Sequence, residues 1–351
     1  MEHFIDDTSS SVQFKKVKNK YPGPLASGIL FSLATILLTY GGFLINFGNG
    51  YLRSGLGELL FILLPVLILL IAGRYNIKDT LKLNKTRPIN YLIIVFLMMF
   101  AMPVVGVLNA IVLGIIRLIF GKNLPISQLV IGDFPTLLAA ILVIGVSAAV
   151  CEETLFRGLI SKGYERFGVV ASLALTSILF GILHRDIQKA VSTILLGAII
   201  GYIVYRTNSI YTGMVAHFTN NTLAVILTFV AEKMTKNLEN LGIKQAGISD
   251  IANMPTASLV IVIVFYGLLF LGFLSACIAL FYAFYKSTQR DRRTEQVITE
   301  TGKSRDFSLL AVISALPGVV LILLTFTGQL LELMNITNGP VYNFLRILGL
   351  I

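Results

Sequence analysis

The chain contains repeated apolar runs that are long enough to cross a lipid bilayer. A helix needs about 20 residues to cross a hydrocarbon core of roughly 30 Å. The runs with this property cover approximately residues 25–47, 55–73, 91–119, 135–166, 168–184, 188–206, 209–231, 257–285 and 308–327. Because backbone groups in lipid must be satisfied internally, each of these spans is predicted to be helical. The sequence therefore predicts an all-α, polytopic membrane bundle with about eight to nine transmembrane helices.

The composition agrees with a membrane bundle and excludes several other classes of protein. Apolar residues make up 56% of the chain and charged residues 13%, with a mean hydropathy of +0.83. An ordinary globular domain is about 25% charged. A secreted disulfide scaffold, a disordered chain and a nucleic-acid-binding protein are excluded. The net charge of +10 points instead to basic loops that set the orientation of the spans.

The spans and the polar stretches between them divide the chain into five segments. We predict, in order, a cytoplasmic polar tail at 1–24, three transmembrane helices at 25–134, a core at 135–231, a polar loop at 232–256, and two C-terminal transmembrane helices with a basic connecting loop at 257–351. Two basic stretches, Arg74–Arg87 and Lys286–Arg305, favour a cytoplasmic N-terminus. The polar loop is interpreted either as a lid over a site or as a linker.

Residues 150–221 interrupt the apolar pattern with three polar clusters. An ionisable group at the centre of a membrane span costs about 2.5–3.5 kcal/mol on insertion scales, so such groups indicate a function. The clusters are Cys151-Glu152-Glu153-Thr154-Leu155-Phe156-Arg157-Gly158, Phe180-Gly181-Ile182-Leu183-His184 and His217-Phe218-Thr219-Asn220-Asn221. The alternative interpretations are a solvated end of a span, an interfacial histidine and an interhelical hydrogen bond, respectively.

Helical spacing indicates how these polar groups pair. Glu153 and Arg157 are four residues apart and are expected to form an ion pair, which leaves Glu152, about 100° round the helix, free. From the helical rise of 1.5 Å per residue, Glu152 and His184 reach a similar depth on either side of the turn near Gly168. The same estimate brings Asn221 to this depth. His217 falls short unless its helix is tilted or its turn lies deeper.

These motifs, read together, resemble those of a known family. The pattern E-E-x-x-x-R, F-x-x-x-H and H-x-x-x-N is similar to that of the CPBP family, also called the Abi or type II CAAX prenyl protease family. The resemblance covers about residues 135–225 and implies that 135–231 is a CPBP-like catalytic core. The family includes CAAX endopeptidases and bacterial proteins linked to bacteriocin processing and self-immunity.

The resemblance implies a role for each matching residue. Glu152 is expected to act as the general base, with His184 directed at the same water, and His217 and Asn221 are expected to stabilise the oxyanion. Glu153, Arg157 and Phe180 are expected to support the site. This division suits peptide hydrolysis, which needs a positioned base and donors aimed at the tetrahedral oxygen. An apolar environment disfavours the alternative of Cys151 as a thiolate nucleophile.

The need for a metal stays open in the sequence. Glu152, His184 and His217 could supply a zinc set with an open position, but no H-E-x-x-H motif is present. We favour a glutamate-activated water without a permanent metal, and no cofactor is certain.

The leading functional hypothesis is an intramembrane endopeptidase that hydrolyses a membrane-associated protein or peptide. The alternative is a bacteriocin self-immunity or scaffold protein that acts by binding a partner. A transporter is disfavoured because the sequence lacks an internal repeat. The expected location is a cell membrane, taken from the family to be a bacterial plasma membrane, with the lipid bilayer and no nucleic acid as partners. The sequence indicates neither the substrate nor the oligomeric state.

Overall fold

The computed structural model describes residues 20–45, 48–125, 131–242, 254–289 and 309–351, and within these ranges every regular element is a helix. Eight of the helical segments are long and apolar enough to cross a membrane. They are Pro24–Phe43, Gly50–Ala72, Pro88–Phe120, Phe134–Phe167, Ala190–Thr207, Ile210–Asn240, Thr256–Ser287 and Val312–Leu333. A ninth apolar helix, Val169–Leu183, is shorter. The predicted all-α polytopic bundle is confirmed.

Most of these segments are single α-helices. In chain order they are α1 (Pro24–Tyr40), α5 (Pro88–Phe120), α9 (Val169–Leu183), α10 (Ala190–Thr207), α11 (Ile210–Asn240), α13 (Thr256–Ser287) and α15 (Leu309–Leu333), followed by the short α16 (Pro340–Ile347). The segment Gly50–Ala72 consists of α2 (Gly50–Gly57) and α3 (Leu64–Ala72), joined by a π-helical turn at Glu58–Leu63.

The fourth span carries the E-E-x-x-x-R motif and is interrupted twice by π-helical turns. It runs through α6 (Phe134–Ala140), α7 (Ala148–Glu153) and α8 (Ser161–Tyr164), with π-helical turns at Ile141–Ser147 and Thr154–Ile160. Single π-helical turns inside α-helices occur frequently at functional sites. Both turns of this span lie next to residues that the sequence analysis singled out.

Capping chemistry sets the start of the fourth span. Asp133 is the N-cap of α6, and Thr136 completes a capping box. The hydroxyl and the backbone N–H of Thr136 both donate to the Asp133 carboxylate, at 2.6 and 2.9 Å. These bonds hold the pKa of Asp133 below its ordinary value, and an ionised carboxylate suits the positive end of a helix.

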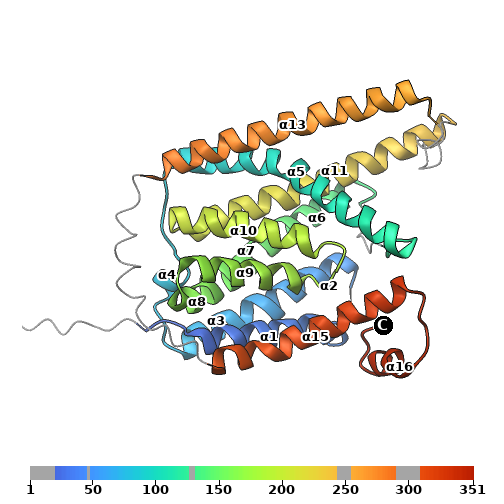
Figure 1. Cartoon of the computed structure of the whole chain (residues 1–351). Helices are drawn as coiled ribbons and strands as arrows, with labels where there is room; N and C mark the ends of the chain where they lie inside the picture. Colours follow the sequence, from blue (N-terminus) through green and yellow to red (C-terminus); the bar gives the residue numbers. More distant parts are fainter. Residues whose placement is uncertain (1–19, 46–47, 126–130, 243–253, 290–308) are drawn as a thin grey trace, which may run out of the picture.

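The helices pack around the α9–α10 hairpin (Figure 1). This hairpin lies beside α11, which also packs against α5 and α7. Helix α13 covers α5 on one side of the bundle, and α1 and α15 lie side by side on the other. Residues from opposite ends of the sequence therefore enclose the middle of the chain, since Ser32 of α1 donates to Ser314 O of α15 at 2.8 Å.

One segment boundary differs from the sequence-based expectation, and parts of three predicted segments lie outside the described residues. Helix α11 continues to Asn240, so the first part of the predicted polar loop at 232–256 is helical. Glu232 and Lys236 sit four residues apart there, a spacing that supports a helix. The rest of that loop at 243–253, most of the polar tail at 1–19, and most of the basic loop at 290–308 lie outside the described residues.

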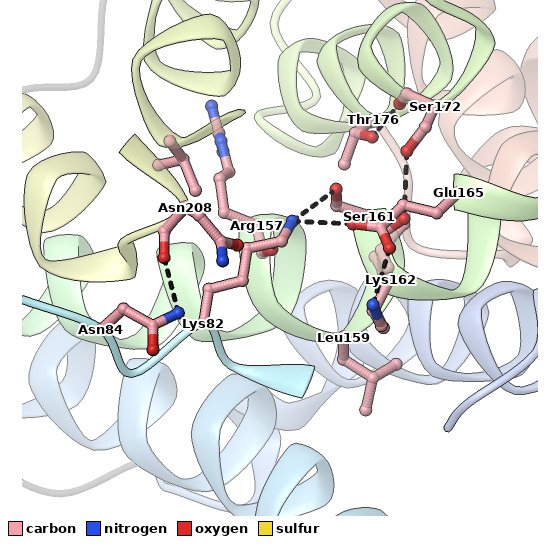
Figure 2. Close-up of polar contacts among 12 residues, drawn as sticks. Lys82, Asn84, Arg157, Leu159, Ser161, Lys162, Glu165, Ser172, Thr176 and Asn208 are labelled. Atoms are coloured by element: carbon pink, nitrogen blue, oxygen red, sulfur yellow. Dashed lines mark hydrogen bonds and ion pairs between the residues drawn. The ribbon is translucent and has the colours of Figure 1, made fainter. Parts of the chain in front are cut away.

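A buried lysine fixes the turn between α10 and α11. Lys82, from the segment before α5, is 7% exposed, and its Nζ donates to Arg157 O at 3.2 Å. Its own carbonyl oxygen accepts from Ile210 N at 3.0 Å. Next to it, the Asn84 side chain donates to Asn208 O at 2.9 Å (Figure 2). The start of α11 is therefore held at the level of Arg157, deep in the bundle.

We expect Gly181→Ala to destabilise the α9–α10 hairpin. A Cβ at Gly181 would lie 2.6 Å from Ile194 N and 2.9 Å from Ile194 Cα, and backbone atoms cannot move aside cheaply. Overpacking of this kind typically costs about 1–3 kcal/mol. The matched control is Gly201→Ala in the same hairpin, where the nearest atom is the flexible Leu173 Cδ2 at 3.3 Å. Equal melting temperatures of the two variants in detergent would contradict the prediction.

Candidate active site

Three charged or polar side chains from two spans form a buried cluster. Arg157 Nε lies 3.2 Å from Glu153 Oε2, which confirms the predicted i,i+4 ion pair. The other carboxylate oxygen of Glu153, Oε1, lies 2.9 Å from His217 Nδ1. Since a carboxylate oxygen accepts hydrogen bonds, Nδ1 of His217 is the donor in this contact. Glu153 therefore links the arginine of its own span to the histidine of α11.

Burial of the cluster decides between the two interpretations of the E-E-x-x-x-R motif. Glu153 is 0% exposed, Arg157 2%, His217 2% and Glu152 8%. The interpretation of this motif as a solvated end of a span is wrong. A buried charge must be paired or hydrogen-bonded to be tolerated. Glu153 is paired with both Arg157 and His217, while Glu153 Oε2 and Arg157 Nη1 make no hydrogen bond within the described structure.

Two glycines allow the neighbouring helices to approach the ion pair. A Cβ at Gly213 of α11 would lie 2.8 Å from Glu153 Oε2, so a side chain there would displace the carboxylate. Gly197 of α10 accepts a hydrogen bond at its carbonyl oxygen from Arg157 Nη2 at 3.0 Å. A backbone carbonyl of α10 thus accepts a hydrogen bond from the Arg157 guanidinium. Because Gly213 of α11 has no side chain, there is room for the Glu153 carboxylate.

The position of His217 differs from the depth estimate in a way that the lysine anchor explains. The estimate placed the turn before α11 level with Gly168, which left His217 short of the site. Lys82 instead holds this turn beside Arg157 and Ser161 (Figure 2), since its Nζ also donates to Ser161 Oγ at 3.3 Å. The turn lies deeper than Gly168, so His217 reaches Glu153.

The deeper turn also changes the position of Asn221. One helical turn beyond His217, Asn221 Nδ2 donates to Ile144 O at 2.8 Å, in the first π-helical turn of the fourth span. Its Oδ1 accepts from Asn220 Nδ2 at 3.1 Å. The structure thus places His217, which the depth estimate left short, at Glu153, and it places Asn221 beside the first π-helical turn of the fourth span. Asn221 keeps one of its two amide hydrogens for another acceptor.

His184 and His217 both pack against the ring of Phe180. The ring centroids are 5.2 Å apart for Phe180 and His184 and 5.7 Å apart for Phe180 and His217, both in edge-to-face arrangements. The guanidinium carbon of Arg157 lies 4.4 Å from the same ring centroid, a cation–π distance. Phe180, which is fully buried, therefore fixes the relative positions of three site residues.

The hydrogen bond of His184 defines which of its nitrogens is available. Nδ1 lies 3.0 Å from Phe180 O. Because a carbonyl oxygen only accepts, Nδ1 carries the hydrogen, and Nε2 of the neutral ring is left as an acceptor. His184 is the C-cap of α9 and its side chain is exposed, so Nε2 is accessible.

Glu152 lies next to a second carboxyl group that the sequence analysis missed. Glu152 Oε2 is buried without a hydrogen-bond partner in the described structure, and the same is true of Glu58 Oε2. The π-helical turn that begins at Glu58 packs near α7, and the two carboxyl groups are within electrostatic range. The sequence feature that could have identified Glu58 is its place as an acidic residue in the otherwise apolar run 55–73, because inserting a charge into lipid is costly.

Within the described residues, no three His, Cys, Asp or Glu side chains are grouped closely enough to hold a metal ion. Zinc ligands must approach to about 2.0–2.3 Å from the metal. His184 and His217 each pack on Phe180, and His217 is bound to Glu153. The alternative zinc set of Glu152, His184 and His217 is not among groups of that kind.

The fold and the cluster together define a multi-pass helical membrane protein with a buried carboxylate–histidine centre. Comparison with known proteins identifies its family more closely. Residues 134–223 match the family described as "Type II CAAX prenyl endopeptidase Rce1-like", which includes every motif of the centre and confirms the resemblance to the CPBP family. This part of the chain is thus similar to a family of endopeptidases.

A curated relative gives a similar result. The "Putative membrane peptidase YdiL" of Bacillus subtilis (strain 168) is 24% identical over 180 residues, which cover 50% of this chain and 72% of the relative. No solved structure matches the chain.

We expect Arg157→Ala to reduce the amount of folded protein as well as any activity. The substitution leaves the Glu153 carboxylate buried without its cation, and removing one partner of a buried pair costs about 3–5 kcal/mol. The measurement is the yield and melting temperature in detergent, with Arg117→Ala, an exposed arginine of α5, as the matched control. Wild-type stability of Arg157→Ala would mean that Glu153 is solvated.

We expect the purified protein to contain less than one zinc per chain and to keep any activity in a chelator. The reason is that no three candidate ligands among the described residues are grouped closely enough to hold a metal ion, and that His217 Nδ1 is bound to Glu153. Metal content is measured by mass spectrometry of the purified protein. One tightly bound zinc per chain, lost in both His184→Ala and His217→Ala, would contradict this expectation.

Proposed function

We propose that this chain is an intramembrane endopeptidase that hydrolyses a peptide bond of a membrane-associated protein or peptide. The observation that carries the proposal is the buried centre in which Glu152 has an unpartnered carboxylate oxygen and His184 and His217 share the Phe180 ring. Such a centre inside apolar helices has the groups that hydrolysis requires. The match of residues 134–223 to an endopeptidase family supports the same reaction.

The base and the water-orienting group in this proposal are Glu152 and His184. Oε2 of Glu152 accepts a proton from a water molecule, and Nε2 of His184 accepts a hydrogen bond from the same water. The resulting hydroxide attacks the carbonyl carbon of the substrate. The protonated Glu152 then returns the proton to the leaving amine, so that a carboxylic acid and an amine are formed and the glutamate is regenerated.

The oxyanion site is proposed to consist of His217 and Asn221. With Nδ1 of His217 bound to Glu153, the opposite nitrogen Nε2 is the atom available to the substrate, and it donates when it carries a proton. Asn221 is fixed by bonds to Ile144 O and to Asn220 Nδ2, and its second amide hydrogen is the other donor. In this arrangement Glu153 and Arg157 act by orienting His217.

The substrate class follows from the surroundings of the site. The described part of the chain has eight apolar helices of spanning length, and Glu153 and His217 lie on two of them, so a substrate must approach through or from a bilayer. We propose a location in a bacterial plasma membrane. The alternative, a self-immunity or scaffold protein that acts by binding, has no supporting observation among the contacts of the site or the comparisons.

We expect Glu152→Gln to abolish hydrolysis while leaving the folded protein intact, because the amide is isosteric but cannot accept the proton of water. General base catalysis contributes about 10²–10⁴-fold to a rate. Cleavage of co-expressed membrane proteins is compared between wild type, Glu152→Gln, His184→Ala and Asn221→Ala. The control is Glu239→Gln, an exposed glutamate near the end of α11. Full activity of Glu152→Gln would rule out the glutamate-base mechanism.

A further inference from the structure

The turn that follows His184 is held by residues from outside the family match. Helix α9 ends at Leu183, His184 is its C-cap, and Arg185 adopts a left-handed backbone conformation with φ 53°. A left-handed φ is uncommon for a residue other than glycine. Such a conformation persists when surrounding contacts hold it in place, and three contacts of this kind are present.

The closest of these contacts comes from Gln329 of α15. Its Nε2 donates to Arg185 O at 2.6 Å, and its Oε1 accepts from Ile187 N at 2.9 Å. The side-chain amide of Gln329 thus binds both a backbone carbonyl oxygen and a backbone N–H of the same turn. Both bonds involve the backbone that leads directly away from His184, so a shift of Gln329 is transmitted to that ring.

Two further elements hold the same turn. Thr39 of α1 accepts from Arg185 Nη1 at 3.1 Å. On the other side, Gln188 Oε1 accepts from Leu124 N at 2.9 Å and its Nε2 donates to Leu124 O at 3.2 Å. Residues 39, 124 and 329 all lie outside the matched range 134–223, so the turn is fixed by parts of the chain that surround the core.

We infer that Gln329 is a positioning residue for His184, and that α15 orients the histidine side of the site. By fixing the turn, Gln329 keeps Nδ1 of His184 on Phe180 O and Nε2 directed away from α9. The catalytic consequence rests on the proposed function, whereas the structural consequence, a fixed tautomer of His184, does not depend on it.

The test combines kinetics with the imidazole signals of ¹⁵N-histidine in the full-length protein. The chain has three histidines, His3, His184 and His217, and His184→Gln assigns the signal of interest. Gln329→Leu removes both bonds at nearly constant volume, and Gln329→Glu keeps the acceptor but loses the donor. The matched control is Thr327→Val on the same helix, where the hydroxyl bonds only to Leu323 O.

We expect Gln329→Leu to lower kcat about tenfold or more with KM nearly unchanged, since small displacements of a catalytic group have effects up to about 10²-fold. The His184 signal should change from a single Nδ1–H tautomer to a mixture, while the His217 signal stays as in wild type. Gln329→Glu should show the same change and provides the test if Gln329→Leu folds poorly. Thr327→Val should match wild type in every measurement.

Two results would overturn the inference. An unchanged His184 signal in both variants would show that Gln329 does not position the ring, whatever happens to kcat. An equal change at His184 and His217 would show a general loosening of the bundle instead of a local effect. If no substrate is cleaved by wild type, the proposed function fails, and the His184 signal still decides the role of Gln329.

Discussion

The ion pair between Glu153 and Arg157 is the interaction on which the arrangement of the core depends. Both groups are enclosed by helices of a membrane protein, where an unpaired charge is strongly destabilising. Three helices therefore have to meet at this point: α10 supplies the carbonyl oxygen of Gly197, α9 supplies the face of Phe180, and α11 supplies His217. The need of these two buried charges for partners thus determines how otherwise similar apolar helices pack.

The ring of Phe180 contacts Arg157 and both histidines of the centre. Leucine or isoleucine would also be apolar at this position, but an aromatic ring offers its face to the guanidinium and meets two imidazoles in edge-to-face contacts. His217 is bound to Glu153, and each of the two histidines packs against the Phe180 ring. This arrangement favours two separate tasks for the histidines, one at the water and one at the developing oxyanion.

The sequence was sufficient for the class of fold and for the Glu153–Arg157 pair, for physical reasons that differ between the two. Spans are predictable because lipid demands long apolar helices, and the Glu153–Arg157 pair is predictable because it is local. The contact of Glu153 with His217 depends on the depth of a turn, and that depth is set by Lys82, which looked like one more basic loop residue. Gln329 and Glu58 had no local motif, because their partners are distant in sequence.

The anchoring of Lys82 has a consequence for the order in which the chain assembles during biosynthesis. Lys82 is separated by 75 residues from Arg157, whose carbonyl oxygen it binds, and Asn84 by 124 residues from Asn208. Its ammonium group would be unpaired in lipid before those residues are made. The first three spans are therefore expected to enter the bilayer with Lys82 still in water. The amine gains its partners Arg157, Ser161 and Glu165 once the fourth span has emerged, whereas the backbone carbonyl of Lys82 gains Ile210 only with the α10–α11 turn. The N-terminal part of the bundle therefore becomes final late.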